Sequence, residues 1–149
     1  MAEWYGEWTH EQIEDEVARI AQAWLAEGVH KWMAYDRVTG DRIGRGGLSR
    51  AHVDGRDCLE IGWALHHKFW RRGYATEIGR AGLAFAFDEL AADEVVSFTE
   101  TRNDRSRAVM ERLGFNYRKE IVIDDEPFAL YVIGRIRPLR PRVPGSLAR

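Results

Sequence analysis

The stretch KFWRRGYATEIGRA, residues 68–81, places two arginines and a glycine directly before apolar residues at helical spacing. A helix start leaves its first backbone N–H groups unpaired and carries partial positive charge, so it can hold a phosphate. Gly73 and Ala75 keep bulk away from these amides, while Arg71 and Arg72 supply charge suited to a pyrophosphate. The stretch matches neither a Walker loop nor a G-x-G-x-x-G fingerprint. It predicts either an anion cradle or an ordinary turn whose arginines are solvated.

The composition predicts a soluble globular protein with one domain. The 149 residues are 45% hydrophobic and 31% charged, and the formal net charge is −2. A chain of this size can bury a full core without disulfides. The slight acidic excess argues against nucleic acid as a partner. The one cysteine, Cys58, excludes an internal disulfide and a cysteine-rich metal site, and its apolar neighbours indicate an inert buried thiol.

The two ends of the chain carry further expectations. The N-terminus shows no charged-then-apolar signal pattern, and no apolar run approaches the ~20 residues of a membrane span. We therefore expect a cytoplasmic protein without a membrane partner. Residues 137–149 hold three of the four prolines and four arginines, so we expect this tail to be disordered or draped over the surface. The folded domain would then cover residues 1–136.

Apolar periodicity and turn residues divide this domain into helices and strands. Thr9 and Gln12 resemble a capping box before a helix that Gly28 ends. Turn segments such as VTGD and VDGRD separate extended runs. The other expected elements are strands at about 30–37, 42–52 and 58–66, a helix at about 73–91, a strand at 94–100, a helix within 103–114, and a hairpin of 116–123 with 127–136. This order predicts an α+β fold: a mixed, mostly antiparallel central sheet with helices on both faces and one βαβ crossover.

Together with its neighbouring residues, the stretch 68–81 resembles the Gcn5-related N-acetyltransferase (GNAT) superfamily. The resemblance rests on EIGWALHHKFWRRGYATE, followed some thirty residues later by NDRSRAVMERLGF, and it covers residues 9–136. Within the superfamily, the stretch resembles most the ribosomal-protein-alanine N-acetyltransferases, in which this motif usually reads WGxGYATE. In the family's phosphate motif, Arg/Gln-x-x-Gly-x-Gly/Ala, Gly73 and Ala75 fill the last two positions and Trp70 stands at the first. Arg71 stands where the motif WGxGYATE has its first glycine.

The resemblance implies a site for acetyl-CoA as co-substrate, without a metal. The pyrophosphate would sit on the amides of residues 71–76. The pantetheine arm would pair with the backbone at the end of the 58–66 strand, in a wedge between that strand and the 94–100 strand. Asn103 would bond the arm. The implied cofactor-binding residues are Trp63, Ala64, Leu65, His66, Arg71, Arg72, Gly73, Tyr74, Ala75, Thr76 and Asn103.

The implied reaction is direct attack of a primary amine on the thioester in a ternary complex. The oxyanion needs a donor, for which the backbone N–H of Leu65 or His66 is available. Ser106 would donate a hydrogen bond to the departing sulfur, or it would serve only as a helix cap. An α-amino group, with a pKa near ~8, is easier to deprotonate than a lysine near ~10.4. A peptide or protein N-terminus or a small weakly basic amine is therefore the expected acceptor.

Glu60 is the candidate general base. Alternation places Glu60 and Gly62 on one face of their strand, and a half-buried carboxylate there could have a raised pKa and accept a proton. The alternative is an exposed residue that pairs with an arginine, and Glu100 is a second candidate base. His66 and His67, as neighbours on a strand, would point to opposite faces and could not chelate one metal.

Four tryptophans, Trp4, Trp8, Trp24 and Trp32, could line an acceptor groove, although aromatic residues at this spacing are more often core.

The chain departs from the family at its start. Members usually open with a β-strand, whereas this chain opens with MAEWYGEWTHEQ. Either the natural N-terminus lies upstream of Met1, or the 30–37 strand is an open sheet edge that could pair in a homodimer. Loss of the acceptor side would leave a non-catalytic CoA-binding or regulatory module as the alternative function. A nucleotide-binding protein ranks last, because the lysine and acidic metal ligands of phosphoryl transfer are missing.

Overall fold

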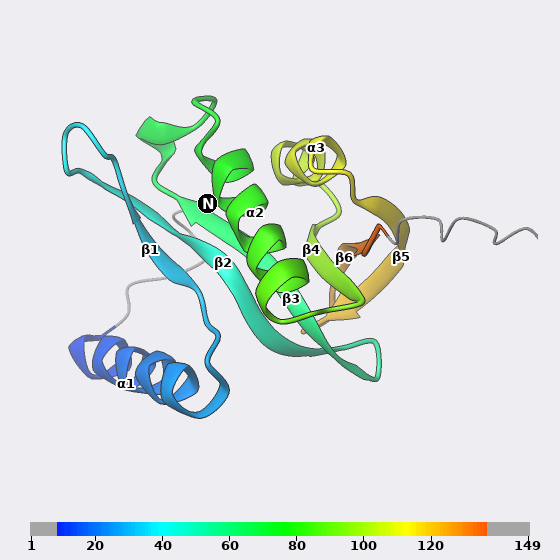
Figure 1. Cartoon of the computed structure of the whole chain (residues 1–149), viewed down its shortest axis with the longest axis horizontal. Coiled ribbons are helices and arrows are strands. Elements are labelled where there is room, and N and C mark those ends of the chain that lie inside the picture. Colours follow the sequence, from blue (N-terminus) through cyan, green and yellow to red (C-terminus); the bar gives the residue numbers. More distant parts are fainter. Residues whose placement is uncertain (1–8, 137–149) are drawn as a thin grey trace, which may run out of the picture.

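A computed structural model describes residues 9–136, which form helices on both faces of one six-stranded sheet (Figure 1). The expected tail at 137–149, Trp4 and Trp8 lie outside the described residues. The elements are α1 (His10–Glu27), β1 (Trp32–Tyr35), β2 (Arg42–Val53), β3 (Arg56–Leu65), the 3₁₀ turn η2 (His67–Phe69), α2 (Tyr74–Ala84), the π-helical turn η3 (Phe85–Glu89), β4 (Glu94–Glu100), α3 (Asp104–Arg112), β5 (Asn116–Ile123) and β6 (Glu126–Gly134).

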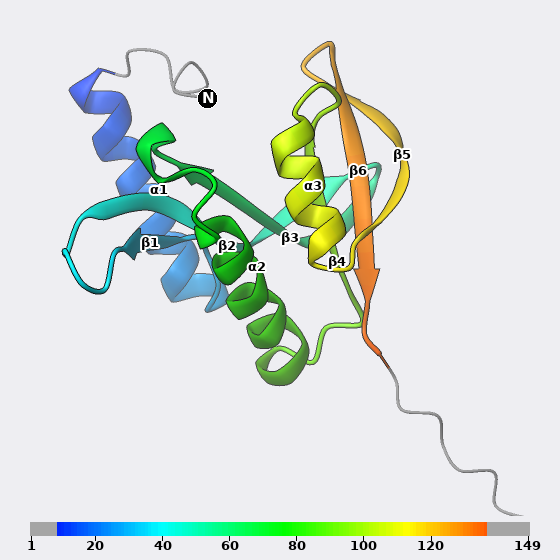
Figure 2. The same ribbon diagram turned by 90° about the horizontal axis from the view of Figure 1, so that it is seen from above.

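The sheet confirms the predicted fold class. Its strand order is β1-β2-β3-β4-β6-β5, and every neighbouring pair is antiparallel except β3 with β4. These two parallel strands share one paired position, Glu60 with Val96. Beyond it, the Ser97 hydroxyl donates to the Ile61 carbonyl at 2.8 Å. Figure 2 shows the two halves of the molecule diverging from this contact, so the sheet opens into a wedge.

Capping residues set the ends of α1 as the sequence predicts. The Thr9 hydroxyl accepts from the Gln12 amide at 3.2 Å, and the Gln12 side chain accepts from the Thr9 amide at 2.8 Å. Gly28 ends the helix with φ of 66°, a conformation that only glycine adopts without strain. The helix predicted at 73–91 is shorter, because its last turn is the π-helical η3.

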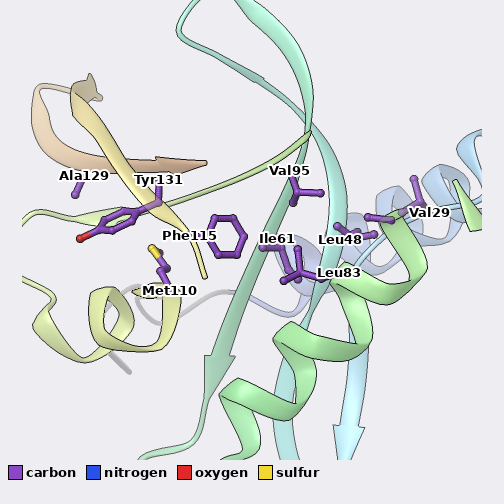
Figure 3. Close-up of a cluster of buried hydrophobic side chains, with 10 residues drawn as sticks. Val29, Leu48, Ile61, Leu83, Val95, Met110, Phe115, Ala129 and Tyr131 are labelled. Atoms are coloured by element: carbon purple, nitrogen blue, oxygen red, sulfur yellow. The ribbon is translucent and has the colours of Figure 1, made fainter. Parts of the chain in front are cut away.

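Helix α2 packs closely on the sheet through small residues. A Cβ at Gly82 would lie 2.5 Å from the Ile61 side chain, and one at Gly46 would lie 2.6 Å from Ile78. The main core lies between the sheet and helices α2 and α3 (Figure 3). Its buried members are Val29, Leu48, Ile61, Leu83, Ala86, Val95, Met110, Phe115, Ala129 and Tyr131.

Helix α1 lies on the other side of the sheet and packs loosely against it. Gly46 faces α2, whereas its neighbour Arg45 lies 3.9 Å from Glu16 of α1, so the two helices lie on opposite faces (Figure 2). None of the α1 residues is buried, and Leu25 is 89% exposed. Within residues 9–136, none of the helices is long and apolar enough to cross a membrane.

His30 makes folding sensitive to pH. It lies between α1 and β1 and is 7% exposed, and its Nδ1 is buried without a hydrogen-bond partner among the described residues. Burial, aided by the positive charges of Arg19 and Lys31, lowers the pKa of His30 below 6.5. The unfolded chain therefore binds more protons than the folded chain, so the free energy of unfolding falls as pH drops through about 6.5.

We predict that the free energy of unfolding in urea decreases between pH 7.5 and pH 5.5, and that His30→Gln reduces this decrease. His67→Gln is the matched control, since His67 is exposed and should leave the pH dependence unchanged. An equal pH dependence in wild type and His30→Gln would contradict the prediction.

Candidate functional site

Two hollows meet where β3 and β4 diverge. The first, which we call the inner pocket, has a volume of about 190 Å³ and contains Lys31, Glu60, Gly62 and Ala64. The second, which we call the outer groove, has a volume of about 410 Å³ and runs to the start of α2. Trp63, Asn103 and Ser106 line both hollows and so mark their junction. The wedge in the sheet thus leads from the helix start to Glu60.

The start of α2 presents a run of unpaired backbone donors at the end of the outer groove. Within residues 9–136, none of the six amides from Arg71 to Thr76 donates to a backbone carbonyl or a side chain. Arg71 has φ of 60° and Gly73 has φ of 83°. Arg71 is a non-glycine residue held in the left-handed region, which costs about 1–3 kcal/mol and is seen most often at ligand sites. Left-handed residues in such a turn let successive N–H groups converge on an anion.

The outer groove is positively charged. Arg71, Arg105 and Arg112 line it, and no acidic residue does so among those that the structure describes. The Arg105 guanidinium lies 4.3 Å from the centre of the Trp70 ring, and the Trp70 Nε1–H donates to the Leu65 carbonyl at 3.0 Å. Trp70 stands at the first position of the family's phosphate motif. Its side chain is therefore hydrogen-bonded to the end of β3 and makes a cation–π contact with Arg105.

Three of the expected cofactor residues have other contacts. The Arg72 side chain is exposed and lies 5.7 Å from the Phe69 ring. The Tyr74 hydroxyl donates to the Asp36 carboxylate and so ties the β1–β2 loop to α2. This bond, with amide donors from the same loop, lowers the pKa of Asp36 to about 2. His66 is exposed and does not line either hollow.

The β2–β3 ladder decides which backbone groups of β3 face the wedge. The His66 amide donates to the Ile43 carbonyl at 2.9 Å, so it is occupied. Hydrogen bonds alternate along an antiparallel ladder, which turns Ala64 toward β2 and Trp63 and Leu65 toward β4. Of the two oxyanion donors expected from the sequence, the Leu65 amide is the one that faces the wedge.

The expected orientation of the histidine pair was wrong. His66 and His67 lie at the end of the strand and in the η2 turn, where their rings approach to 4.4 Å with a 30° tilt. Among residues 9–136 there is no group of three His, Cys, Asp or Glu residues that could hold a metal ion.

Glu60 is buried in a network of donors within the inner pocket. It is 9% exposed, and its Oε2 accepts from the Lys31 Nζ and from the Ser49 hydroxyl at 3.1 Å. The Lys31 Nζ also donates to the Gly47 carbonyl at 3.0 Å. The expected alternative, an exposed glutamate paired with an arginine, was wrong, because the glutamate is buried and its partner is a lysine.

Asn103 and Ser106 begin α3 at the junction of the two hollows. The Asn103 Oδ1 accepts from the Ser106 amide at 3.2 Å, and its Nδ2 donates to the Thr99 hydroxyl at 3.0 Å. Asn103 is therefore the helix cap, and the expectation that Ser106 caps the helix was wrong. The Ser106 side chain is 7% exposed and borders both hollows.

Other candidates lie away from the junction. Glu100 accepts from the Arg102 Nε at 3.0 Å and does not line either hollow. Neither Trp24 nor Trp32 lines a hollow, and Trp32 packs edge-to-face on a core phenylalanine. Burial raises the pKa of the Cys58 thiol, which keeps it protonated and unreactive.

The family model of the GNAT acetyltransferase domain matches residues 1–116. This chain belongs to the GNAT acetyltransferase family. Bacillus subtilis YkkB is 32% identical over 104 residues, which is 70% of this chain and 60% of YkkB. An Aspergillus fumigatus FsC-acetyl coenzyme A-N(2)-transacetylase is 43% identical over 61 residues, 41% of this chain and 26% of that protein. The matched part of this chain therefore spans 60% of the length of YkkB and 26% of the length of the Aspergillus protein.

A solved structure shares the fold of this GNAT chain. The acetyltransferase from Agrobacterium tumefaciens superposes with a TM-score of 0.72 at 26% sequence identity, and the alignment covers 87% of this chain and 75% of that one. The family resemblance and the fold expected from the sequence are both confirmed.

The Lys31–Glu60 pair should be worth measurably more than an exposed ion pair. We predict that Lys31→Met lowers the free energy of unfolding by about 3 kcal/mol, because it leaves a buried carboxylate without its counter-charge. The double variant Lys31→Met/Glu60→Met should recover much of this loss. Arg56→Met is the matched control, since its pair with Glu94 is exposed and should contribute less than about 1 kcal/mol. Urea denaturation of the four proteins tests this, and equal losses for Lys31→Met and Arg56→Met would contradict it.

Proposed function

We propose that this protein is an acetyl-CoA-dependent N-acetyltransferase that acetylates a primary amine by direct attack in a ternary complex. The observation that carries the proposal is the wedge at the single β3–β4 contact. It joins a basic groove that ends in free amides to a pocket that contains a carboxylate. Membership of the GNAT family supports acetyl transfer as the reaction.

The outer groove matches the charge of the cofactor. The pyrophosphate would lie on the amides of residues 71–76, where Arg71 and the start of α2 supply positive charge. The pantetheine arm would pair with the backbone of Trp63, which faces the wedge. Arg105 and Arg112 line the same groove and would face the cofactor's phosphates. The thioester would then reach the junction beside Ser106.

The residues at the junction supply the groups that acetyl transfer needs. The Leu65 amide would stabilise the oxyanion, and the Ser106 hydroxyl would donate a hydrogen bond to the departing sulfur. Glu60, which accepts a hydrogen bond from Lys31, would take the proton of the acceptor ammonium, directly or through a water. The tetrahedral intermediate would then expel the CoA thiolate and leave the amide product.

The proposed acceptor is a peptide or protein N-terminus, or a small weakly basic amine. These amines lose a proton more easily than a free lysine side chain in water. The motif WRRGYATE, residues 70–77, supports assignment to the ribosomal-protein-alanine N-acetyltransferases within the family. The Aspergillus relative's name says that it transfers acetyl from coenzyme A to an N(2) position, which supports an amine acceptor here.

Binding of acetyl-CoA is the first test. We expect calorimetric titration to give one site for acetyl-CoA and none for ATP. Ala75→Glu should raise the Kd for acetyl-CoA at least about tenfold, because it places a negative charge beside the pyrophosphate site. Ala81→Glu is the matched control, since Ala81 is an exposed residue of the same helix. Equal affinity of the two variants would contradict the cradle, and no binding by the wild type would contradict the proposed function.

The acceptor is then sought by following CoA release with peptides that bear free N-termini and with small amines. Glu60→Gln and Ser106→Ala should slow release by about 10- to 1000-fold while leaving acetyl-CoA binding intact. Acetyl-CoA binding without turnover on any amine would favour the non-catalytic module instead.

A further inference from the structure

Lys31 places a primary amine of the protein itself inside the inner pocket. Its Nζ donates to Glu60, the group that we propose as proton acceptor, and to the Gly47 carbonyl. The side chain is 18% exposed, and it lines the inner pocket together with Ser106 and Trp63 of the junction. The chain therefore holds a potential acetyl acceptor against its own candidate base.

Gly62 leaves the space beside β3 that this amine occupies. A Cβ at Gly62 would lie 3.3 Å from the Lys31 Nζ and 2.6 Å from the Glu60 Oε1, so the ion pair lies directly over this glycine. Ala64, two residues further on the same face of β3, also lines the pocket. Two residues of strand span about 7 Å. Gly62 directly precedes Trp63, whose backbone would hold the thioester arm, so the amine lies within about this span of the part of β3 that would position the thioester.

We infer that Lys31 is a self-acetylation site of this protein, an inference that rests on the proposed function. Glu60 takes a proton from the Lys31 ammonium, and the neutral Nζ attacks the thioester carbonyl carbon. The C–N bond forms, the C–S bond breaks, and CoA leaves as a thiolate that is then protonated. The net reaction converts the ammonium and acetyl-CoA into Nε-acetyl-lysine, CoA thiol and one proton. The product no longer carries the charge that pairs with Glu60.

The other lysines make this inference easy to test. The chain has three lysines, at positions 31, 68 and 119. Lys68 is exposed, and the side chain of Lys119 is 47% exposed in a surface pair with Asp54. Acetylation without catalysis follows accessibility, so Lys31 would react last. Acetylation through the pocket reverses this order.

The experiment incubates the full chain with acetyl-CoA and no acceptor, and follows each lysine by peptide mass spectrometry over time. We expect Lys31 to be acetylated at least about tenfold faster than Lys68 and Lys119, as base-assisted attack allows. Acetic anhydride, applied to the same protein, should modify Lys68 and Lys119 first.

Two variants connect the modification to the pocket. Glu60→Gln should slow acetylation of Lys31 at least about tenfold, whereas the matched control Glu94→Gln, on a strand-end pair with Arg56, should not change it. Circular dichroism and acetyl-CoA titration verify that each variant is folded and binds. Should Glu60→Gln fail to fold, Ser106→Ala provides the second test, because it alters the junction from α3 and should slow the same reaction.

The outcomes separate the inference from the proposed function. If acetyl-CoA binds and Lys31 stays unmodified, or reacts after Lys68 and Lys119, self-acetylation is overturned and the proposed function stands. If Lys31 reacts first but equally fast in Glu60→Gln and in Ser106→Ala, pocket catalysis is overturned. If acetyl-CoA does not bind, the proposed function fails by its own test.

Discussion

The rest of the structure depends on one constraint: β3 and β4 pair at a single position, Glu60 with Val96. The core holds the two halves of the sheet together at this position, and one residue further along both strands the Ser97 hydroxyl donates to the Ile61 carbonyl. Beyond these two contacts, backbone groups of β3 face the wedge instead of a neighbouring strand. Buried backbone donors and acceptors need partners, so the open seam is a place for a ligand whose own amides can pair with them.

The seam also separates two electrostatic environments. Outside, Arg71, Arg105 and Arg112 line the groove beside the unpaired amides at the start of α2, and no acid is among its described lining residues, which suits a polyanion. Inside, the charges are compensated within a short distance, since Lys31 and Ser49 both donate to Glu60. The groove is therefore basic, while the charges of Lys31 and Glu60 balance in the pocket. Trp63, Asn103 and Ser106 line both hollows, and this is why we propose the junction as the place of the reaction.

Small residues make both environments possible. Gly46 and Gly82 let α2 approach the sheet closely, which brings the start of that helix to the mouth of the groove. Gly62 leaves space over β3 that the Lys31–Glu60 pair fills. Any side chain at these positions would force its neighbours to move, so the shape of the site depends on the packing of the backbone as much as on the polar groups.

The sequence by itself determined the order of the elements, the capped start of α1 and the helix start directly behind Gly73. These features depend on residues within one helical turn or on strict alternation, so neighbours in the chain are sufficient to predict them. It did not reveal that Lys31 pairs with Glu60, that Ile43 occupies the His66 amide, or that Arg102 holds Glu100 away from the junction. Lys31 and Glu60 are 29 positions apart, and no local pattern records which distant side chains meet. Only the tertiary structure decided those partners, because the register of β2 on β3 and the opening between β3 and β4 place them together.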